Sequence, residues 1–261
     1  MGEIVQIRSW YERQKSPVSD RSIIYTAIAG GYDRLQSPRD LDSPASEGIR
    51  RMAFVDNPAL CGAADCPGWQ IKIMTSICTV PLMQAKRYKV LSHEALPADT
   101  AFSLWVDGSV EFNSRLDPAY LAMKFLGNHD LALFRHSRRG CIYREAHACQ
   151  IRGLDDPSVM ARQMNQYRAE GYPRNNGLAE CTMILRRHTP MVERLNNLWW
   201  SEIQHGSRRD QLSFDYACWK LGIKYAYLPG TVDQNPFFKK HRHVRPTVNQ
   251  SPYRRAWVEG T

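Results

Sequence analysis

Short apolar blocks alternate with amphipathic stretches along this chain, and the alternation predicts its secondary structure. Apolar or β-branched runs of strand length cover residues 22–29, 51–56, 69–74, 102–106, 131–136, 181–185 and 225–228. Helical segments are predicted at 81–90, 118–125, 157–171, 190–205 and 210–221. Because strands and helices follow one another in turn, the pattern predicts one α/β domain with a mixed, mostly parallel sheet flanked by helices.

Turn and capping residues mark where these elements begin and end. Gly30-Gly31 follows the first strand, and Asn57-Pro58 stops the second. Asp117-Pro118 is a favourable helix start, because proline lacks the amide hydrogen that stays unsatisfied in a first turn. Gly171 and Gly222 follow the last apolar residues of two predicted helices.

The composition is that of a globular chain with a core of its own. Its 261 residues are 43% hydrophobic and 23% charged. No apolar run approaches the roughly 20 residues needed to cross a bilayer, and the N-terminus lacks the apolar segment of a signal peptide. We therefore expect a cytoplasmic protein. Its expected divisions are an N-terminal arm at 1–20, the domain at 21–235, and a basic tail at 236–261 that folds back over the site or stays apart from it.

The seven cysteines are irregularly spaced. Cys61 and Cys66 form a close pair, but a zinc site needs a second pair or suitably spaced histidines. A metal at this pair is the less favoured interpretation. The favoured one is reduced cysteines, with Cys78, Cys181 and Cys218 as small core residues.

A formal net charge of +9 needs a physical reason. Basic proteins concentrate anions such as nucleic acid, anionic membrane surfaces or phosphorylated substrates. The excess gathers at 135–144, 186–187, 208–209 and 239–255. A solvated basic surface and an enzyme for a nucleoside diphosphate both fit this pattern, and a polyanionic acceptor stays open.

Three predicted strand ends carry an aspartate: Asp33, Asp56 and Asp107. Ligands of open α/β sheets bind at the carboxyl ends of the strands. Gly30 and Gly31 would let such a ligand approach the backbone closely. A carboxylate at Asp107 suits a divalent metal on the diphosphate of an activated sugar, because Mg²⁺ and Mn²⁺ prefer oxygen ligands. The alternative is an aspartate that caps the following turn.

Asp210 opens a predicted helix between Arg209 and Gln211. It suits an N-terminal charge that satisfies free amides, and it also suits a group that binds an acceptor hydroxyl or stabilises a sugar cation. His241 and His243 alternate in the basic tail, where they complete a metal site, contact a phosphate or stay solvated. Further polar groups beside apolar strands are His136, Arg139, Glu145, Glu180 and His188.

Individually weak motifs occur in one order along most of the chain. They lie at 25–33, 89–93, 105–108, 135–146, 163–173, 180–188, 198–202 and 209–214. As a set, from about Ile23 to His243, they resemble the glycosyltransferase-like family once catalogued as domain of unknown function 616. That family occurs in plant mucilage-related proteins and in many bacteria.

The resemblance implies a GT-A fold, in which a Rossmann-like sheet binds a nucleotide-sugar, usually with Mn²⁺ or Mg²⁺, and a hexosyl- or pentosyltransferase activity. Carried over by position, the catalytic residues are Asp210, Gln211 and Glu180, and the metal ligands are Asp107 and His241. The acceptor-binding residues are His136, Arg139, Glu145 and Arg209. The donor-binding residues are Tyr25, Thr26, Ala27, Gly30, Gly31, Asp33, Asp56, Arg87, Lys89, Trp105, Asp107 and Gly108.

The chain departs from the usual acidic motif, because Ser109 stands where a second aspartate is expected. A bound metal would then have fewer protein ligands, or the enzyme would need no metal. The expected acceptor is a polysaccharide, a lipid-linked glycan or a modified base in DNA. The alternative is a transferase-like module without catalysis that binds nucleic acid or glycan through its basic face.

Overall fold

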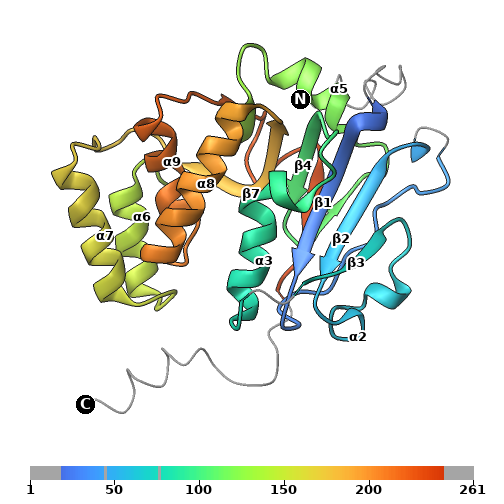
Figure 1. The fold of residues 1–261 in the computed structure, drawn as a ribbon, viewed down its shortest axis with the longest axis horizontal. Coiled ribbons are helices and arrows are strands. Elements are labelled where there is room, and N and C mark those ends of the chain that lie inside the picture. Colours follow the sequence, from blue (N-terminus) through green and yellow to red (C-terminus); the bar gives the residue numbers. More distant parts are fainter. Residues whose placement is uncertain (1–18, 44–45, 76–77, 244–261) are drawn as a thin grey trace.

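A seven-stranded sheet forms the centre of the computed structural model, which describes residues 19–43, 46–75 and 78–243 (Figure 1). Its strand order is β3–β2–β1–β4–β7–β6–β8. Every strand runs in the same direction except β7, which is antiparallel to both of its neighbours. The predicted α/β fold is confirmed. The strands are β1 (Ser22–Ile28), β2 (Arg50–Val55), β3 (Gln70–Ile73), β4 (Phe102–Val106), β6 (Leu131–Arg135), β7 (Ala179–Arg187) and β8 (Ala226–Tyr227).

Several helices begin where a capping side chain precedes a proline. Asn57, Asp117, Asp156 and Thr189 each accept hydrogen bonds from amides of the first turn, and each precedes a proline. This local chemistry explains why the sequence located the starts at Pro118, Pro157 and Pro190, whereas Asn57-Pro58 was interpreted only as the end of a strand. The helices are α2 (Pro58–Cys61), α3 (Pro81–Val90), α4 (Ser92–Ala95), α5 (Pro118–Phe125), α6 (Ile142–Ile151), α7 (Pro157–Ala169), α8 (Pro190–His205) and α9 (Gln211–Lys220).

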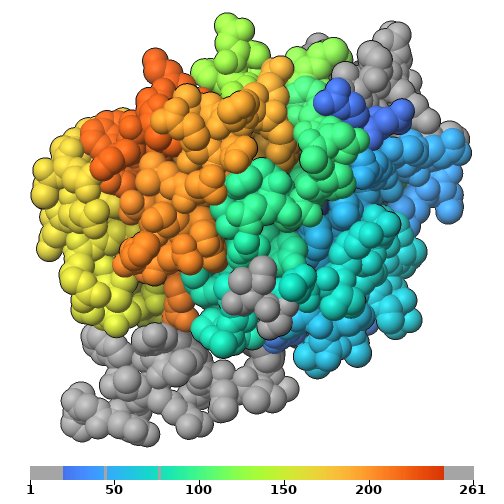
Figure 2. All heavy atoms as spheres, viewed as in Figure 1, coloured from blue at the N-terminus to red at the C-terminus, as the bar shows by residue number. Residues whose placement is uncertain are grey.

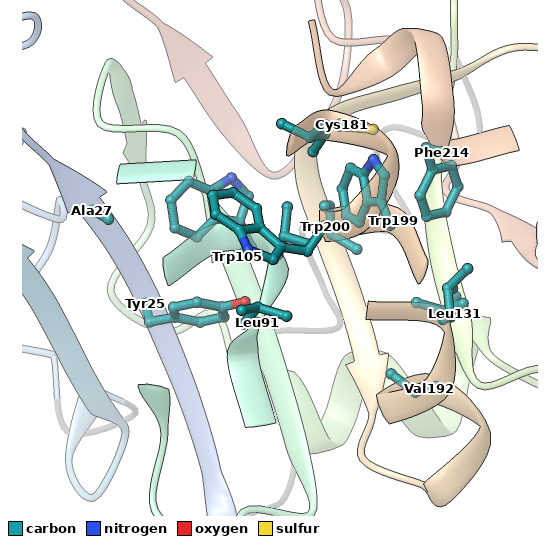
Figure 3. Packing of buried hydrophobic residues seen from close by; sticks show 14 of the residues in the cluster. Tyr25, Ala27, Leu91, Trp105, Leu131, Cys181, Val192, Trp199, Trp200 and Phe214 are labelled. Carbon is teal, nitrogen blue, oxygen red and sulfur yellow. The ribbon is translucent and has the colours of Figure 1, made fainter. Parts of the chain in front are cut away.

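Helices cover both faces of the sheet, because successive strand residues point to opposite sides. Tyr25 and Trp105 point to the face that α3, α8 and α9 cover, where they join Trp199 and Phe214 in one core cluster (Figure 3). Ile24 points to the other face, which α5 covers. Figure 2 shows α3 and α8 side by side on the surface of the molecule. Helices α6 and α7 lie beyond α9, away from the sheet (Figure 1).

Some elements escaped the sequence pattern. The sequence of helix α6 is polar and lacks a regular apolar period, so the pattern did not predict this helix. A second, two-stranded sheet pairs β5 (Val110–Phe112) with β9 (Phe238–Lys240). Three-residue strands carry too few positions for an apolar period, so only the tertiary fold reveals them.

Other expectations concern single residues and the chain ends. Trp199 and Trp200 are both buried in the core. The Sγ atoms of Cys61 and Cys66 contact backbone carbonyls in a buried cluster, and all seven cysteines are free thiols. No helix in the described part of the chain is long and apolar enough to cross a membrane. Residues 1–18 of the expected arm and 244–261 of the expected tail lie outside the described residues.

Candidate active site

The carboxyl edge of the sheet gathers most of the predicted site residues. Strand β1 leads into Gly30 and Gly31, while β2 and β4 end directly before Asp56 and Asp107. Strand β7 runs the opposite way, so its beginning brings Glu180 to this same edge. The parallel arrangement therefore places segments from distant parts of the sequence side by side.

Two tight turns at this edge require glycine. The amide of Gly30 donates to the Asp56 carboxylate at 2.7 Å, and its φ of +67° lies in the left-handed region that favours glycine. A Cβ atom on Gly108 would lie 2.6 Å from Cγ1 of Ile28. The turn after β4 thus packs directly on the end of β1, with no room for a side chain.

Four charged residues meet between helix α3 and this edge, and we call them the lysine–carboxylate cluster: Lys86, Lys89, Asp107 and Asp210. Nζ of Lys89 lies 3.1 Å from Asp107 and 2.8 Å from Asp210. Nζ of Lys86 donates to the other oxygen of Asp210 at 2.7 Å. Residues three apart share one face of a helix, so α3 directs both lysines at the two carboxylates.

Burial makes the charges of this cluster strongly interdependent. Burial alone would raise the pKa of Asp210, but Lys86, Lys89 and Arg209 outweigh it and hold that pKa far below its usual value. Burial would lower the pKa of Lys89, but the carboxylates of Asp107 and Asp210 raise it above its usual value. Burial lowers the pKa of Lys86, because a single carboxylate partner offsets it only in part. Asp210 and Lys89 are therefore a fixed anion and a fixed cation.

The predicted acceptor residues form a second charged group next to this cluster. Arg139 is ion-paired with the buried carboxylate of Glu145. His136 lies 3.6 Å from the same carboxylate and accepts amide hydrogen bonds from its own loop, while burial lowers its pKa. Arg209 is attracted to both Asp210 and Glu145, and it connects the two groups.

Glu180 differs from the other acids of the site. Within the described residues its side chain makes no hydrogen bond or ion pair, and it is only partly buried. Burial raises its pKa, Lys240 lowers it, and the nearby acids Asp233, Asp107 and Glu145 raise it further. A carboxyl group with a raised pKa and no bound partner is suited to accept a proton.

Helix α9 fixes the segment that presents Glu180. Gln211 donates its side-chain amide to the carbonyl of Ala179 at 3.1 Å. Asp215 accepts a hydrogen bond from the amide of the same residue at 3.0 Å. The sequence analysis missed Asp215, because an aspartate inside a helix carries no signal of its burial. Burial raises its pKa to about 6, against the lowering effect of hydrogen bonds from Tyr225 and Ala179.

Asp215→Asn is expected to change the pH dependence of stability. The carboxyl group of Asp215 holds its proton more tightly in the folded chain, so its contribution to the free energy of unfolding falls as pH rises from about 4 to about 6. Relative to the unaltered protein, the variant should therefore gain about 3 kcal/mol between roughly pH 4 and pH 7. Urea denaturation of both proteins at each pH measures this difference. A difference that does not vary with pH would contradict the assignment.

The C-terminal segment returns to the same edge. The amide of His241 donates to the carbonyl of Ser109 at 2.8 Å, and its imidazole lies 2.6 Å from Glu111. His243 lies 2.7 Å from Asp33, and this contact raises the pKa of His243. The described part of the tail therefore folds back onto the turns after β1 and β4.

The family model for the TOD1/MUCI70, glycosyltransferase-like domain matches residues 12–243. The chain belongs to this family. The resemblance inferred from the motifs is thus confirmed.

The probable hexosyltransferase MUCI70 of Arabidopsis thaliana is 26% identical to this family member over 225 residues. The match covers 77% of this chain but only 38% of the plant protein. Two solved structures are similar to the chain, each with a TM-score of 0.44. Mouse xyloside xylosyltransferase 1 in its apo form is 11% identical, covering 79% of this chain and 84% of its own. Core-mannan synthase A of Aspergillus fumigatus in an Mn/GDP form is 9% identical. That match covers 80% of this chain and 72% of the synthase chain. At this level of similarity, neither structure bears on the roles of residues in this chain.

Some residues predicted to bind the donor lie where they cannot contact it. Tyr25 and Thr26 are completely buried, and the hydroxyl of Tyr25 contacts Arg186 in the core. The prediction that these two side chains contact the donor directly is therefore wrong, because neither has any accessible surface. Arg87 is ion-paired with Glu94 instead of joining the cluster. Ala27 and Trp105 are also buried, although the indole of Trp105 donates to Asp107 at 2.9 Å.

Lys86 and Arg186 are site-supporting residues that the sequence did not single out. The i, i+3 spacing of Lys86 and Lys89 is the signal that could have found the first. Arg186 is fully buried and donates to the carbonyl of Lys89 at 3.1 Å, which holds the end of α3 in place.

The residues expected to hold Mn²⁺ or Mg²⁺ do not assemble into a ligand set. Asp107 is engaged by Lys89, and the imidazole of His241 is engaged by Glu111. Ser109 offers no carboxylate, and its hydroxyl is buried without a hydrogen-bond partner. In the described ranges, no three His, Cys, Asp or Glu side chains group to hold a metal ion.

Proposed function

We propose that this chain transfers a sugar from a nucleotide-sugar to an acceptor hydroxyl at the carboxyl edge of its sheet. The observation that carries the proposal is the lysine–carboxylate cluster, which places buried cations and carboxylates beside the glycine turns. Membership of a glycosyltransferase-like family supports it, as does the plant relative's name of probable hexosyltransferase. Hexosyl transfer is accordingly the proposed reaction.

The nucleotide is proposed to lie on the turns after β1, β2 and β4. Gly30, Gly31 and Gly108 keep these turns free of side chains, and Asp33 and Asp56 shape them. Asp107 lies next to Lys89, where the donor diphosphate would meet the cluster. The expected Mn²⁺ or Mg²⁺ is not needed for this arrangement, because both ammonium groups already supply positive charge.

The transfer step is proposed to occur between Asp210 and Glu180. The bond from the anomeric carbon to the diphosphate oxygen breaks, and the nucleoside diphosphate leaves with the electron pair. The acceptor oxygen bonds to the anomeric carbon, and Glu180 takes the acceptor proton. The fixed anion of Asp210 stabilises positive charge that develops on the sugar.

The acceptor is proposed to approach over the second charged group, which contains His136, Arg139, Glu145 and Arg209. Hydroxyls on a polysaccharide, on a lipid-linked glycan or on a modified DNA base are the candidates. The net charge of +9 favours an anionic acceptor. Binding to DNA through phosphate contacts would weaken steeply with added salt, so salt titration separates DNA from a neutral glycan. A cytoplasmic location remains a prediction.

Nucleotide release from a panel of UDP-, GDP-, CMP- and dTDP-sugars tests the function. We expect release from one donor, accelerated by the correct acceptor. Asp107→Asn should reduce release by about 100-fold or more, because Lys89 loses a carboxylate that holds its ammonium group beside the diphosphate. Asp65→Asn is the matched control, since Asp65 is exposed and takes no part in the ion pairs of the cluster. Failure of every donor, with and without glycan and DNA acceptors, would overturn the proposal, and full activity of Asp107→Asn would overturn the role of Asp107.

A further inference from the structure

The lysine–carboxylate cluster contains Asp107, the residue that the family resemblance assigns to a divalent cation. Nζ of Lys89 lies between two carboxylates, 3.1 Å from Asp107 and 2.8 Å from Asp210. Bridging two carboxylates is the geometry that a bound cation would adopt. Here a covalently attached ammonium group occupies that position.

The expected metal ligands are also engaged or absent. Ser109 replaces the second aspartate, and its carbonyl is covered by the amide of His241. The imidazole of His241 is directed at Glu111. Asp107 alone would remain, beside the ammonium of Lys89, which repels a cation. The donor set therefore does not fit Mn²⁺ or Mg²⁺.

The charge balance of the cluster suits an anion. Within the cluster Lys86 and Lys89 balance Asp107 and Asp210, and Arg209 of the second charged group, which is attracted to Asp210, adds one positive charge beside them. An ammonium group has three donor hydrogens. Lys89 donates one hydrogen bond to Asp107 and forms an ion pair with Asp210, and Lys86 donates one hydrogen bond to Asp210, so donors remain for phosphate oxygens.

We infer that the ammonium groups of Lys89 and Lys86 neutralise the diphosphate of the donor in place of a divalent cation. The inference rests on the proposed function, because it assigns a chemical role within the same site. Asp107 then acts as a positioning residue for Lys89, and Asp210 positions both lysines in addition to its proposed role at the sugar. Arg186 supports them through the backbone carbonyl of Lys89.

Calorimetric titration with UDP and GDP tests this inference without requiring turnover. In the unaltered protein, we expect the dissociation constant to agree within about twofold in EDTA, MgCl₂ and MnCl₂, since no metal takes part. Lys89→Met should weaken binding by about tenfold or more in every buffer, because a charge-assisted contact to phosphate is lost. Lys86→Met should weaken it less. Lys224→Met is the matched control, because Lys224 is exposed and outside the site.

The outcomes separate the inference from the function. Nucleotide binding that EDTA abolishes and Mn²⁺ restores would overturn the inference, while donor-dependent transfer would leave the proposed function intact. Unchanged binding by Lys89→Met would also overturn it. Absence of nucleotide binding and of nucleotide release in all buffers would overturn the proposed function itself. Should Lys89→Met fail to fold, as its thermal melting would reveal, the metal comparison on the unaltered protein still decides.

Discussion

Asp210→Ala is expected to lose about 3–5 kcal/mol of unfolding free energy together with nearly all donor turnover. The carboxylate is buried against Lys86, Lys89 and Arg209, and its removal leaves three cations without their principal counter-charge. Breaking one side of a buried ion pair costs far more than the pair contributes as a whole. Urea denaturation measures the stability loss, and nucleotide release measures turnover.

Two comparisons make the Asp210 prediction specific. Glu94→Ala breaks the exposed pair with Arg87 and should cost less than about 1 kcal/mol. Adding Lys86→Met to Asp210→Ala should recover part of the lost stability, because one uncompensated cation is removed with it. Equal denaturation midpoints for Asp210→Ala and the unaltered protein would show that the cluster does not carry this energy.

Trp199→Ala is expected to lose about 3–5 kcal/mol of unfolding free energy, because it leaves a large cavity between α8 and the sheet. Trp199 is completely buried, and its ring packs edge-on against Phe214 with centroids 5.0 Å apart (Figure 3). Its indole also donates to the carbonyl of Asp210 at 2.9 Å. The variant should therefore lower nucleotide release as well, through displacement of Asp210.

Trp199→Phe separates packing from the hydrogen bond. It keeps an aromatic ring but loses the indole donor, and we expect a cost of about 1–2 kcal/mol. Met191→Ala, at an exposed position of the same helix, should stay within about 0.5 kcal/mol of the unaltered protein. A cost for Trp199→Ala no larger than that of Met191→Ala would refute the packing argument.

The lysine–carboxylate cluster also shows which parts of the site the sequence could predict. Asp107 and Asp210 were found because each follows a recognisable boundary, a buried strand in one case and a helix start in the other. Lys89 was assigned to the donor only through the family resemblance. Lys86 was not assigned at all, because its pairing with Asp210 spans 124 positions and its i, i+3 spacing from Lys89 was the one local indication of a shared role.

By itself, the sequence determined the α/β alternation, most strand and helix positions, and the family. These properties rest on local chemistry: apolar periodicity, proline at helix starts, and glycine after strands. The tertiary structure alone decided that β7 is antiparallel, that residues 238–240 pair with β5, and that His241 contacts Glu111. It also showed that Tyr25 and Thr26 are buried and do not line the ligand surface, because burial depends on which helices cover each face of the sheet. Long-range packing decides which charged groups meet, and here it brought Lys89 between two carboxylates that the sequence had assigned to different roles.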